Sequence, residues 1–291
     1  KLKIKAFIES VFLIFLGILT SLSLPPLNYL IINFFTFSLF FIFLINKANQ
    51  HRIKKFFFLY GWLFGLGYFG SNLYWISISL TFDQNFKFLI PYTLILIPAF
   101  LSIFYGAISF FFIILKPSKV ISAFFKFSLI FGILEFIRGS ILTGFPWNLI
   151  AYSFSSQLEI LSVTSIIGTY GFNLFCITLF TSPSLLFLGK LKYNKIIFGF
   201  FIFLTISFYF YGNSYKDRFF KTPAKDYDYK LRVIGSNIGL NRFYENIDIA
   251  SVLQELIKIS NPEGGDKTIF VWPEGILPDI YQDELIQFSG L

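Results

Sequence analysis

Seven apolar stretches constrain the fold of this chain more than any other feature of its sequence. They cover residues 6–24, 27–46, 56–80, 88–115, 120–138, 160–188 and 195–211. A helix needs about 20 apolar residues to cross the hydrocarbon core of a bilayer. With 44 Phe and 16 Tyr among 291 residues, the chain also carries more aromatic mass than one water-soluble core could hide. We therefore expect residues 1–211 to form a polytopic α-helical membrane domain of about seven helices.

Basic residues are distributed unevenly among the connections between these stretches. The N-terminus and every second connection carry twelve Lys and Arg residues, whereas the other connections show only Lys87 and Arg138 near their ends. Because cytoplasmic loops are enriched in Lys and Arg, the N-terminus is predicted to be cytoplasmic. Seven crossings would then place residues 212–291 outside, in the periplasm of a bacterial cell. The first stretch lacks a small-residue cleavage signal, which favours a retained anchor over a signal peptide.

Acidic residues indicate a domain boundary near residue 212. Only four of the 16 acids lie in residues 1–211, and the others lie in residues 212–291. Residues 212–230 are polar and without periodicity, so they are predicted to be a linker that leads into a second domain at 231–291. The net charge of +8 arises mainly in the membrane part. No basic patch with interleaved aromatic residues lies outside the apolar stretches, so we expect no nucleic-acid partner.

Residues 231–291 begin with a strand–helix–strand pattern. Residues 231–235 predict a strand, residues 245–259 an amphipathic helix, and the apolar run 268–272 a buried strand. Such a unit forms a parallel strand pair through a right-handed crossover. Glu274 follows the second strand, where open α/β sheets place their reactive groups. Flanked by a Trp-Pro pair, its carboxylate is expected to be partly desolvated and a better base; the alternative is a surface Glu in a turn.

His51 and Cys176 are the only His and the only Cys of the chain. A His-dependent triad or a multi-His metal site cannot form within it, and we expect neither a metal nor a cofactor. His51 lies in a basic loop and is expected to be solvated. Cys176 lies in the middle of an apolar stretch and is expected to be a small apolar filler.

Four blocks in the membrane part resemble one enzyme family. They are residues 23–26, residues 61–69 with 74–76, residues 135–139 with 143–148, and residues 168–171. Further on, the tripeptide that ends at Glu274 resembles the first catalytic motif of the nitrilase superfamily. With these motifs the chain is similar to the bacterial apolipoprotein N-acyltransferases over essentially its whole length. The Thr-Gly-Phe-Pro-Trp-Asn run of residues 143–148 is the most specific part.

The resemblance implies that residues 231–291 are the N-terminal part of an α/β nitrilase-like (carbon–nitrogen hydrolase) domain. It implies a monomeric inner-membrane enzyme that moves a fatty acyl chain from a phospholipid to the N-terminal amine of a diacylglyceryl-Cys lipoprotein. The reaction would be ping-pong, through a thioester on a nucleophilic Cys. Glu274 matches the family's general base, which takes the thiol proton. Trp147 and Tyr244 are candidate substrate-binding residues, although Trp147 could equally be an interfacial anchor.

The chain departs from the family pattern in two places. The family's oxyanion-stabilising Lys and nucleophilic Cys lie well downstream of the Glu, whereas this chain ends soon after Glu274. Cys176 precedes the second domain, and Lys267 is predicted to lie in a loop, so neither can replace them. Because no Met is present, even at residue 1, we expect a fragment that is inactive alone. Residues 242–244 are Arg-Phe-Tyr where the family usually has Lys-Trp, which puts a substrate role of Tyr244 in doubt.

Two further features of the membrane part suggest specific contacts. Glu135 and Arg138 are three residues apart near the outer end of the fifth stretch, so they can pair on one helix face. An ion pair that braces the following loop is favoured over contact with lipid headgroups. Gly65, Gly67 and Gly70 lie along the third stretch and suit close helix packing.

Three alternatives differ from the acyltransferase hypothesis. A transporter or channel with a small external cap would place ionisable residues along a path in mid-membrane. A nitrilase-type amidase that is merely tethered to the membrane would not need residues 143–148. A degenerate or split gene product would bind a partner that supplies the missing part.

Overall fold

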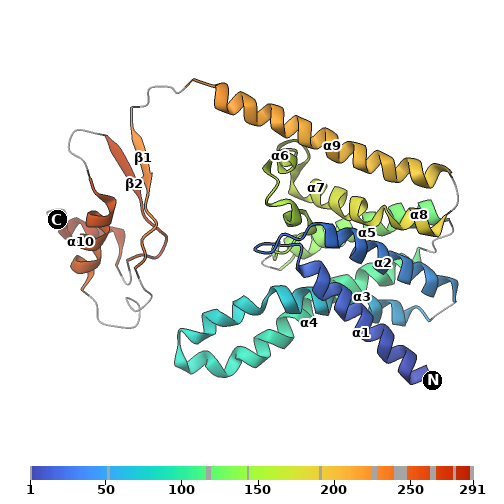
Figure 1. The fold of residues 1–291 in the computed structure, drawn as a ribbon. Helices are drawn as coiled ribbons and strands as arrows, with labels where there is room; N and C mark the ends of the chain where they lie inside the picture. The colour runs from blue at the N-terminus through green and yellow to red at the C-terminus, as the bar shows by residue number, and fades with distance from the viewer. Residues whose placement is uncertain are drawn as a thin grey trace. The chain divides into compact units, whose positions relative to one another are not determined.

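The computed structural model describes residues 2–50, 53–115, 119–142, 144–189, 192–223, 228–238, 248–262, 267–277 and 280–288. The chain divides into two compact units, Lys1–Lys221 and Thr222–Leu291. The first unit is a helical bundle and the second contains the strands (Figure 1).

The first unit consists of helices of very different length. In chain order they are α1 (Leu2–Ser21), α2 (Ile31–Asn49), α3 (Lys55–Asn72), η1 (Tyr74–Thr81), η2 (Gln84–Leu89), α4 (Ile90–Ile114), α5 (Val120–Ser140), η3 (Ile150–Phe154), α6 (Leu158–Leu161), α7 (Thr164–Thr181), α8 (Ser184–Leu188) and α9 (Lys192–Lys221), where η denotes a 3₁₀ helix.

Six segments among the described residues are long and apolar enough to cross a membrane. They contain α1, α2, α4, α5, α7 with α8, and α9, and they correspond to six of the seven predicted stretches. Residues 56–80 are not among the six, so their crossing of the membrane stays a prediction. There α3 ends at Asn72 and the chain continues as the 3₁₀ helix η1. The Gly, Tyr, Ser and Asn residues of α3 lower its mean hydropathy. The same helix packs closely against its neighbours.

Helix α3 lies between α1 and α4 and packs closely against both. A Cβ at Gly67 would overlap the backbone of α1, and a Cβ at Gly61 would overlap the backbone of α4. Gly65 also faces α4 at close range, whereas Gly70 has open space around it. The predicted packing role is therefore confirmed for Gly65 and Gly67 and is wrong for Gly70.

Aromatic side chains fill the centre of the bundle. The rings of Phe40 and Phe64 stack with their centroids 4.3 Å apart, and many further ring pairs meet edge to face. The fully buried phenylalanines of this core include Phe37, Phe41, Phe112, Phe124, Phe127 and Phe131. Much of the unusual Phe content thus serves packing between helices.

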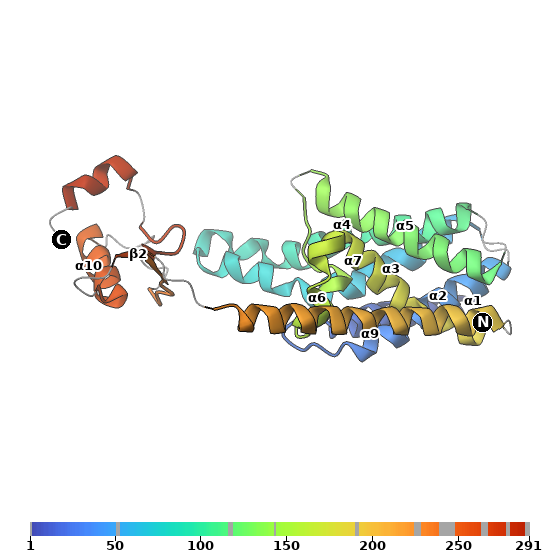
Figure 2. The ribbon, with the colours of Figure 1, turned by 90° about the horizontal axis from the view of Figure 1, so that it is seen from above.

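The long helices run back and forth through the bundle (Figures 1 and 2). The N-terminus, the end of α2 and the beginning of α9 lie at one end, which we call the basic end because the basic connections lie there. The connection from α1 to α2, the helices η1 and η2, and the segment after α5 lie at the other end, which we call the site end. The alternation matches the uneven distribution of Lys and Arg that the sequence shows.

One predicted boundary of the first unit is wrong, and one predicted stretch is subdivided. The stretch 160–188 comprises α6, α7 and α8, with a kink inside α7 where Gly168 adopts a φ of +71°, and Thr164–Leu188 is one of the six membrane-length segments. Residues 212–221, predicted as the beginning of a linker, form the last turns of α9. A change from apolar to polar residues marks where a helix leaves the apolar environment and does not by itself end the helix.

The second unit has the predicted strand–helix–strand order. Strands β1 (Lys230–Val233) and β2 (Thr268–Val271) pair in parallel, with Leu231 opposite Ile269, and α10 (Ile249–Ser260) connects them. The short 3₁₀ helix η5 (Gln282–Phe288) follows. Val252, Leu256 and Ile276 form a small buried cluster between α10 and the segment after β2. The prediction of a parallel pair joined by an amphipathic helix is confirmed.

Candidate functional site

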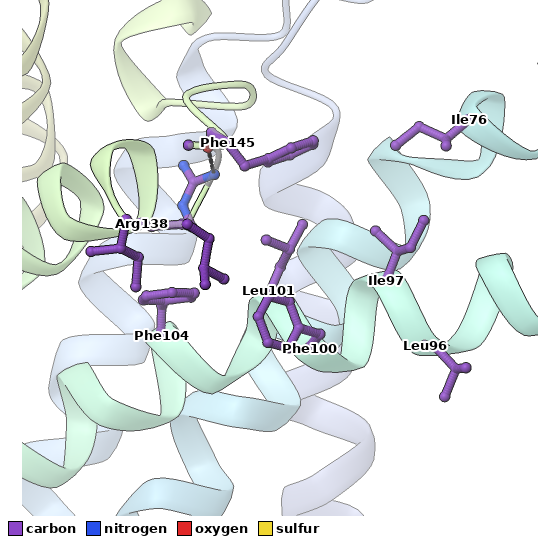
Figure 3. A pocket seen from close by; sticks show the side chains of 11 residues that line it. Ile76, Leu96, Ile97, Phe100, Leu101, Phe104, Arg138 and Phe145 are labelled. Atoms are coloured by element: carbon purple, nitrogen blue, oxygen red, sulfur yellow. Dashed lines mark hydrogen bonds between the residues drawn. The ribbon is translucent and has the colours of Figure 1, made fainter.

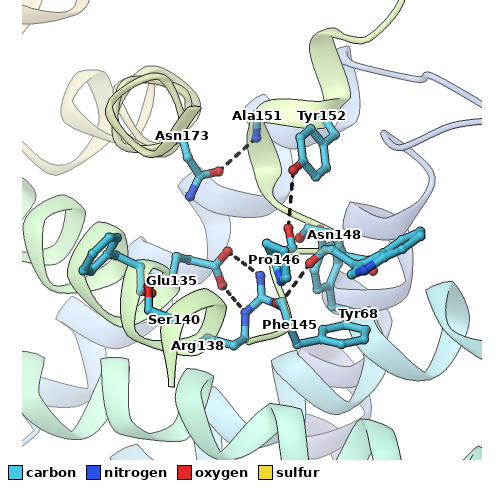
Figure 4. Close-up of polar contacts among 12 residues, drawn as sticks. Tyr68, Glu135, Arg138, Ser140, Phe145, Pro146, Asn148, Ala151, Tyr152 and Asn173 are labelled. Atoms are coloured by element: carbon cyan, nitrogen blue, oxygen red, sulfur yellow. Dashed lines mark hydrogen bonds and ion pairs between the residues drawn. The ribbon is translucent and has the colours of Figure 1, made fainter. Parts of the chain in front are cut away.

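A buried ion pair in α5 holds the irregular segment that follows this helix. Two nitrogens of the Arg138 guanidinium donate to the Glu135 carboxylate over 3.1 and 2.8 Å, and neither side chain is exposed. Arg138 also donates to the backbone carbonyls of Phe145 (2.7 Å) and Trp147 (2.9 Å) (Figure 4). The predicted ion pair that braces the following loop is confirmed. Because both side chains are buried, the alternative of a contact with lipid headgroups is wrong.

Two more helices hold the same segment through its backbone. The Tyr68 hydroxyl of α3 donates to the carbonyl of Asn148 over 2.8 Å. The Asn173 side chain of α7 accepts a hydrogen bond of 3.0 Å from the backbone N–H of Ala151 (Figure 4). The left-handed φ of +59° at Asn148 shows that the segment does not continue a helix. Its shape is therefore imposed by side chains of three surrounding helices, since it makes few regular backbone hydrogen bonds of its own.

A cavity of about 830 Å³ opens beside this segment, and we call it the mixed cavity because its lining is partly polar and partly apolar. Three connections at the site end of the bundle contribute to it. Its lining residues are Ser21, Leu22, Leu24, Pro25, Pro26, Leu27, Ser71, Asn72, Tyr74, Trp75, Pro146, Trp147, Asn148, Tyr152 and Ser155. The volume and the composition are those of a ligand site that combines apolar walls with a few polar groups.

Two polar groups in the mixed cavity are suited to contact a ligand. Among the described residues, the amide nitrogen of Asn72 is buried and makes no hydrogen bond. A buried donor without a partner is costly, so a bound molecule that accepts its hydrogen bond would be stabilised. Burial raises the pKa of the Tyr152 phenol above its usual value, so this hydroxyl stays protonated. It donates a long hydrogen bond of 3.4 Å to the carbonyl of Pro146.

Three of the four sequence blocks contribute to the mixed cavity at this end of the bundle, and the fourth packs against one of them. Residues from 23–26, 74–76 and 143–148 line the mixed cavity, and Thr143 itself is outside the described residues. The fourth block, 168–171, supports the third, because Gly139 leaves room for the hydroxyl of Tyr170 and a Cβ there would overlap it. Segments that are far apart in the sequence thus build one site.

Trp147 lies in the wall of the mixed cavity with 56% of its surface exposed. Its position fits a substrate-binding role, and it also fits an interfacial anchor. The sequence did not single out Tyr68, Asn72 or Asn173. Tyr68 belongs to the block 61–69, so its place in a motif was the only available signal. No local sequence pattern distinguishes Asn72 and Asn173 from other polar residues of their helices. Their roles follow from the cavity beside Asn72 and from the hydrogen bond of Asn173 to Ala151.

Glu274 lies in the turn directly after β2 and is exposed. Gly275 follows with a φ of +64°, a conformation that favours glycine and lets the chain turn sharply. The expected partial desolvation of the carboxylate is wrong for the described residues. The reason is that Trp272 turns toward α10, where its indole N–H donates to the Ser260 hydroxyl over 2.9 Å, and does not cover the carboxylate.

The remaining sequence candidates have clear places or lie outside the described residues. Cys176 is fully buried in α7, as expected of an apolar filler. Lys267 is exposed and directly precedes β2, as predicted. Tyr244 and His51 are outside the described residues. Within the described part of the chain, no group of three or more His, Cys, Asp or Glu residues could hold a metal ion.

The four acids of residues 1–211 all have structural partners. Glu9 pairs with Lys47, Glu135 with Arg138, and Glu159 with Lys216, while Asp83 accepts a hydrogen bond from the backbone of η2. A transporter or channel would instead use such groups along a path through the membrane.

Comparison with known proteins identifies the family. The family model described as the apolipoprotein N-acyltransferase N-terminal domain matches residues 16–181, which is more than half of the chain and includes all four blocks. The chain belongs to the apolipoprotein N-acyltransferase family. It is a multi-pass membrane protein. Family membership favours the acyltransferase hypothesis over a transporter or channel.

Several curated relatives are bacterial apolipoprotein N-acyltransferases. The relative from Rickettsia prowazekii is 31% identical over 271 residues, which are 91% of this chain and 52% of the relative. The relative from Rhodopseudomonas palustris is 28% identical over 281 residues, 90% of this chain and 50% of the relative. The relative from Allorhizobium ampelinum is 27% identical over 289 residues, 94% of this chain and 53% of the relative. The chain spans about half the length of these relatives.

Proposed function

We propose that this chain is the N-terminal part of an enzyme that transfers a fatty acyl chain from a phospholipid to the N-terminal amine of a diacylglyceryl lipoprotein. The observation that carries the proposal is that residues from three family blocks line one mixed cavity at the site end of the bundle, while the fourth block packs against the third. In this proposal the membrane unit binds and orients lipid substrates, and the chemistry takes place in a nitrilase-like domain.

The mixed cavity has the chemistry needed for the polar part of a lipid beside its apolar chains. The indoles of Trp75 and Trp147 and the prolines supply apolar area, while Asn72, whose buried amide nitrogen makes no hydrogen bond among the described residues, adds a polar side chain to the lining. Trp is well suited to the depth at which headgroup and hydrocarbon meet. Trp147 is thus assigned to substrate binding, and the ion pair of Arg138 to positioning it.

The second unit would supply the general base. Glu274 takes the proton of a Cys thiol, and the thiolate attacks an ester carbonyl of the phospholipid. The lysophospholipid leaves and an acyl thioester remains. The lipoprotein amine then attacks the thioester, the amide forms and the thiol is restored. The Cys and an oxyanion-stabilising Lys would lie downstream of residue 291.

The exposed face of the two-stranded sheet supports a larger α/β domain. Leu231, Val233, Ile269 and Val271 lie on this face and are 42–70% exposed, whereas Arg232 on the opposite face donates to the carbonyl of Ser260 at the end of α10. Sheets in α/β proteins bury both faces, so these side chains are expected to be covered by further elements.

On the same proposal the membrane unit lies in the bacterial inner membrane. Its N-terminus is cytoplasmic, and the chain from Thr222 onward is periplasmic.

The proposal is tested in the longer protein of which this chain would be the N-terminal part. With a fluorescent phospholipid donor, Glu274→Gln is expected to abolish the acyl-thioester without changing membrane insertion. Glu255→Gln is the matched control, because Glu255 is an exposed carboxylate on α10 of the same unit. Normal thioester formation in Glu274→Gln would refute the assignment of the base. A coding sequence that ends at residue 291 would instead favour the degenerate or split gene product.

A further inference from the structure

A second cavity lies on the other side of the segment that Arg138 holds, and we call it the apolar groove. It has a volume of about 510 Å³ and lies between α4 and the segment after α5 (Figure 3). Its lining residues are Ile76, Leu96, Ile97, Phe100, Leu101, Phe104, Arg138, Ile141, Leu142, Gly144 and Phe145. Arg138 is the only one of these residues with a polar side chain. Its guanidinium is already engaged by Glu135 and by two backbone carbonyls, so the groove offers no free charge.

The groove follows α4 in the half of the helix nearest the site end. From Leu96 to Phe104 the helix rises by about 12 Å, since each residue adds about 1.5 Å. One leaflet of a bilayer has a hydrocarbon thickness of about 15 Å, half of the core. Leu96, Phe100 and Leu142 at the groove are strongly exposed, so the groove is continuous with the lipid-facing surface of the bundle. Its length and position match an extended acyl chain in one leaflet.

One wall separates the apolar groove from the mixed cavity. Ile76 and Phe145 line the groove, while Trp75 and Trp147, one and two residues away in the chain, line the mixed cavity. Both chain segments that form this wall belong to family blocks. Arg138 fixes one of them through its hydrogen bond to the carbonyl of Phe145. The two cavities are therefore built together, with an apolar compartment on one side of the wall and a partly polar compartment on the other.

We propose that the apolar groove binds one acyl chain of the phospholipid donor and that the Ile76–Phe145 wall keeps this chain apart from the mixed cavity. The inference rests on the proposed function and names the substrate contact of the membrane unit. A phospholipid is the occupant, because it is the bulk component of the bilayer into which the groove opens and reaches the groove without leaving its leaflet. Among the described lining residues, no side chain offers a free polar group, so the headgroup is not favoured in this compartment.

The test uses the chain in vesicles that contain a phosphatidylethanolamine with a photoreactive diazirine in its acyl chain. Labelled peptides are identified by mass spectrometry. Labelling of the groove residues of α4 between Leu96 and Phe104 and of Ile141, Leu142, Gly144 and Phe145 is expected to exceed labelling of the lipid-facing side of α9 several-fold. The same lipid with the diazirine in its headgroup should not label the groove. Ile97→Trp fills the groove and should reduce its labelling at least fivefold. Ile103→Trp, at an exposed position of α4 outside the groove, should leave labelling unchanged.

Uniform labelling of all lipid-facing helices, or equal labelling by the two probes, would overturn the inference without reliance on any variant. Preferential labelling by a diacylated lipopeptide with the same probe would also overturn it, since the phospholipid would then not be the occupant. The outcome is separate from that of the proposed function. Groove labelling without thioester formation in the longer protein refutes the function alone, whereas thioester formation without groove labelling refutes the groove alone.

Discussion

The indole rings of Trp75 and Trp147 lie 5.6 Å apart at an angle of 44°, although one follows α3 and the other follows α5. This contact closes one side of the mixed cavity. It depends on the buried ion pair of α5, because Arg138 donates to the carbonyl of Trp147 and fixes the segment that carries the ring. A charged pair inside the bundle thereby controls the position of a half-exposed side chain at its surface.

Removal of either indole should weaken binding of the lipid donor in the longer enzyme. An aromatic contact of this kind contributes about 0.5–1.5 kcal/mol, so Trp147→Ala should raise the KM for phospholipid about two- to tenfold with a smaller effect on kcat. Trp147→Phe should retain most of the affinity. Initial rates at varied phospholipid mole fraction measure both constants. Tyr193→Ala, an exposed aromatic residue at the basic end, is the control, and an equal effect there would argue against a binding role of Trp147.

Loss of Arg138 should be strongly destabilising. Arg138→Gln leaves the buried Glu135 carboxylate without its partner, and such a change costs about 3–5 kcal/mol. The double variant Glu135→Gln with Arg138→Gln removes the isolated charge and should recover part of the loss. Thermal unfolding in detergent measures stability, and limited proteolysis reports whether residues 144–149 become accessible. A double variant less stable than Arg138→Gln would contradict this account of the pair.

Two glycines of α3 should respond oppositely to the same substitution. Gly67→Ala places a Cβ against the backbone of α1, and overpacking of this kind costs about 1–3 kcal/mol. Gly70→Ala has open space around the new Cβ and should be neutral or slightly stabilising, because Ala is a better helix former. The unfolding temperatures of both variants in the same detergent provide the comparison. Similar destabilisation by both would show that α3 does not pack on α1 as described.

Reporter fusions should reveal the orientation of the bundle. A fusion at Thr222, directly after α9, is expected to place alkaline phosphatase in the periplasm, where the enzyme is active. A fusion after Gln50, at the end of α2, is expected to stay in the cytoplasm, where a fluorescent protein is bright. Because α3 falls short of the hydropathy of the other spans, a third fusion at Asn72 tests whether it crosses. An inactive phosphatase and a bright fluorescent protein fused at Thr222 would place this residue in the cytoplasm and overturn the topology.

Acid should loosen the attachment of α6 to α9. Lys216 donates to the Glu159 carboxylate over 2.8 Å, and this hydrogen bond lowers the pKa of Glu159 below its ordinary value. A lowered pKa means that the contact stabilises the fold fully above the ordinary carboxyl pKa. That stabilisation is lost as the pH falls through the lowered pKa of the folded state.

Hydrogen exchange of residues 158–161, corrected for its intrinsic pH dependence, should therefore rise in acid. The control Glu159→Gln should exchange faster at neutral pH and show little further change. A wild-type protection that is independent of pH would contradict the contact.

Sequence alone was sufficient for features that depend on local composition and spacing. Six of the seven apolar stretches are membrane-length helices, because about 20 apolar residues in sequence are enough to demand a helix in lipid. The pair of Glu135 and Arg138 followed from a spacing of three residues on one helix. The strand–helix–strand order of the second unit followed from its hydrophobic periodicity. Motif resemblance gave the family, which the family model confirms.

Only the tertiary structure decided which of these features lie together. The mixed cavity joins three connections of the bundle, its wall and the contact of Trp75 with Trp147 join segments separated by about 70 residues, and no local pattern encodes such proximity. The role of α3 as a packing helix, the end of α9 at Lys221 and the exposure of Glu274 were also beyond the sequence. Helix neighbours are selected by close backbone approach and by buried hydrogen bonds to loop carbonyls, and both depend on residues from several helices at once.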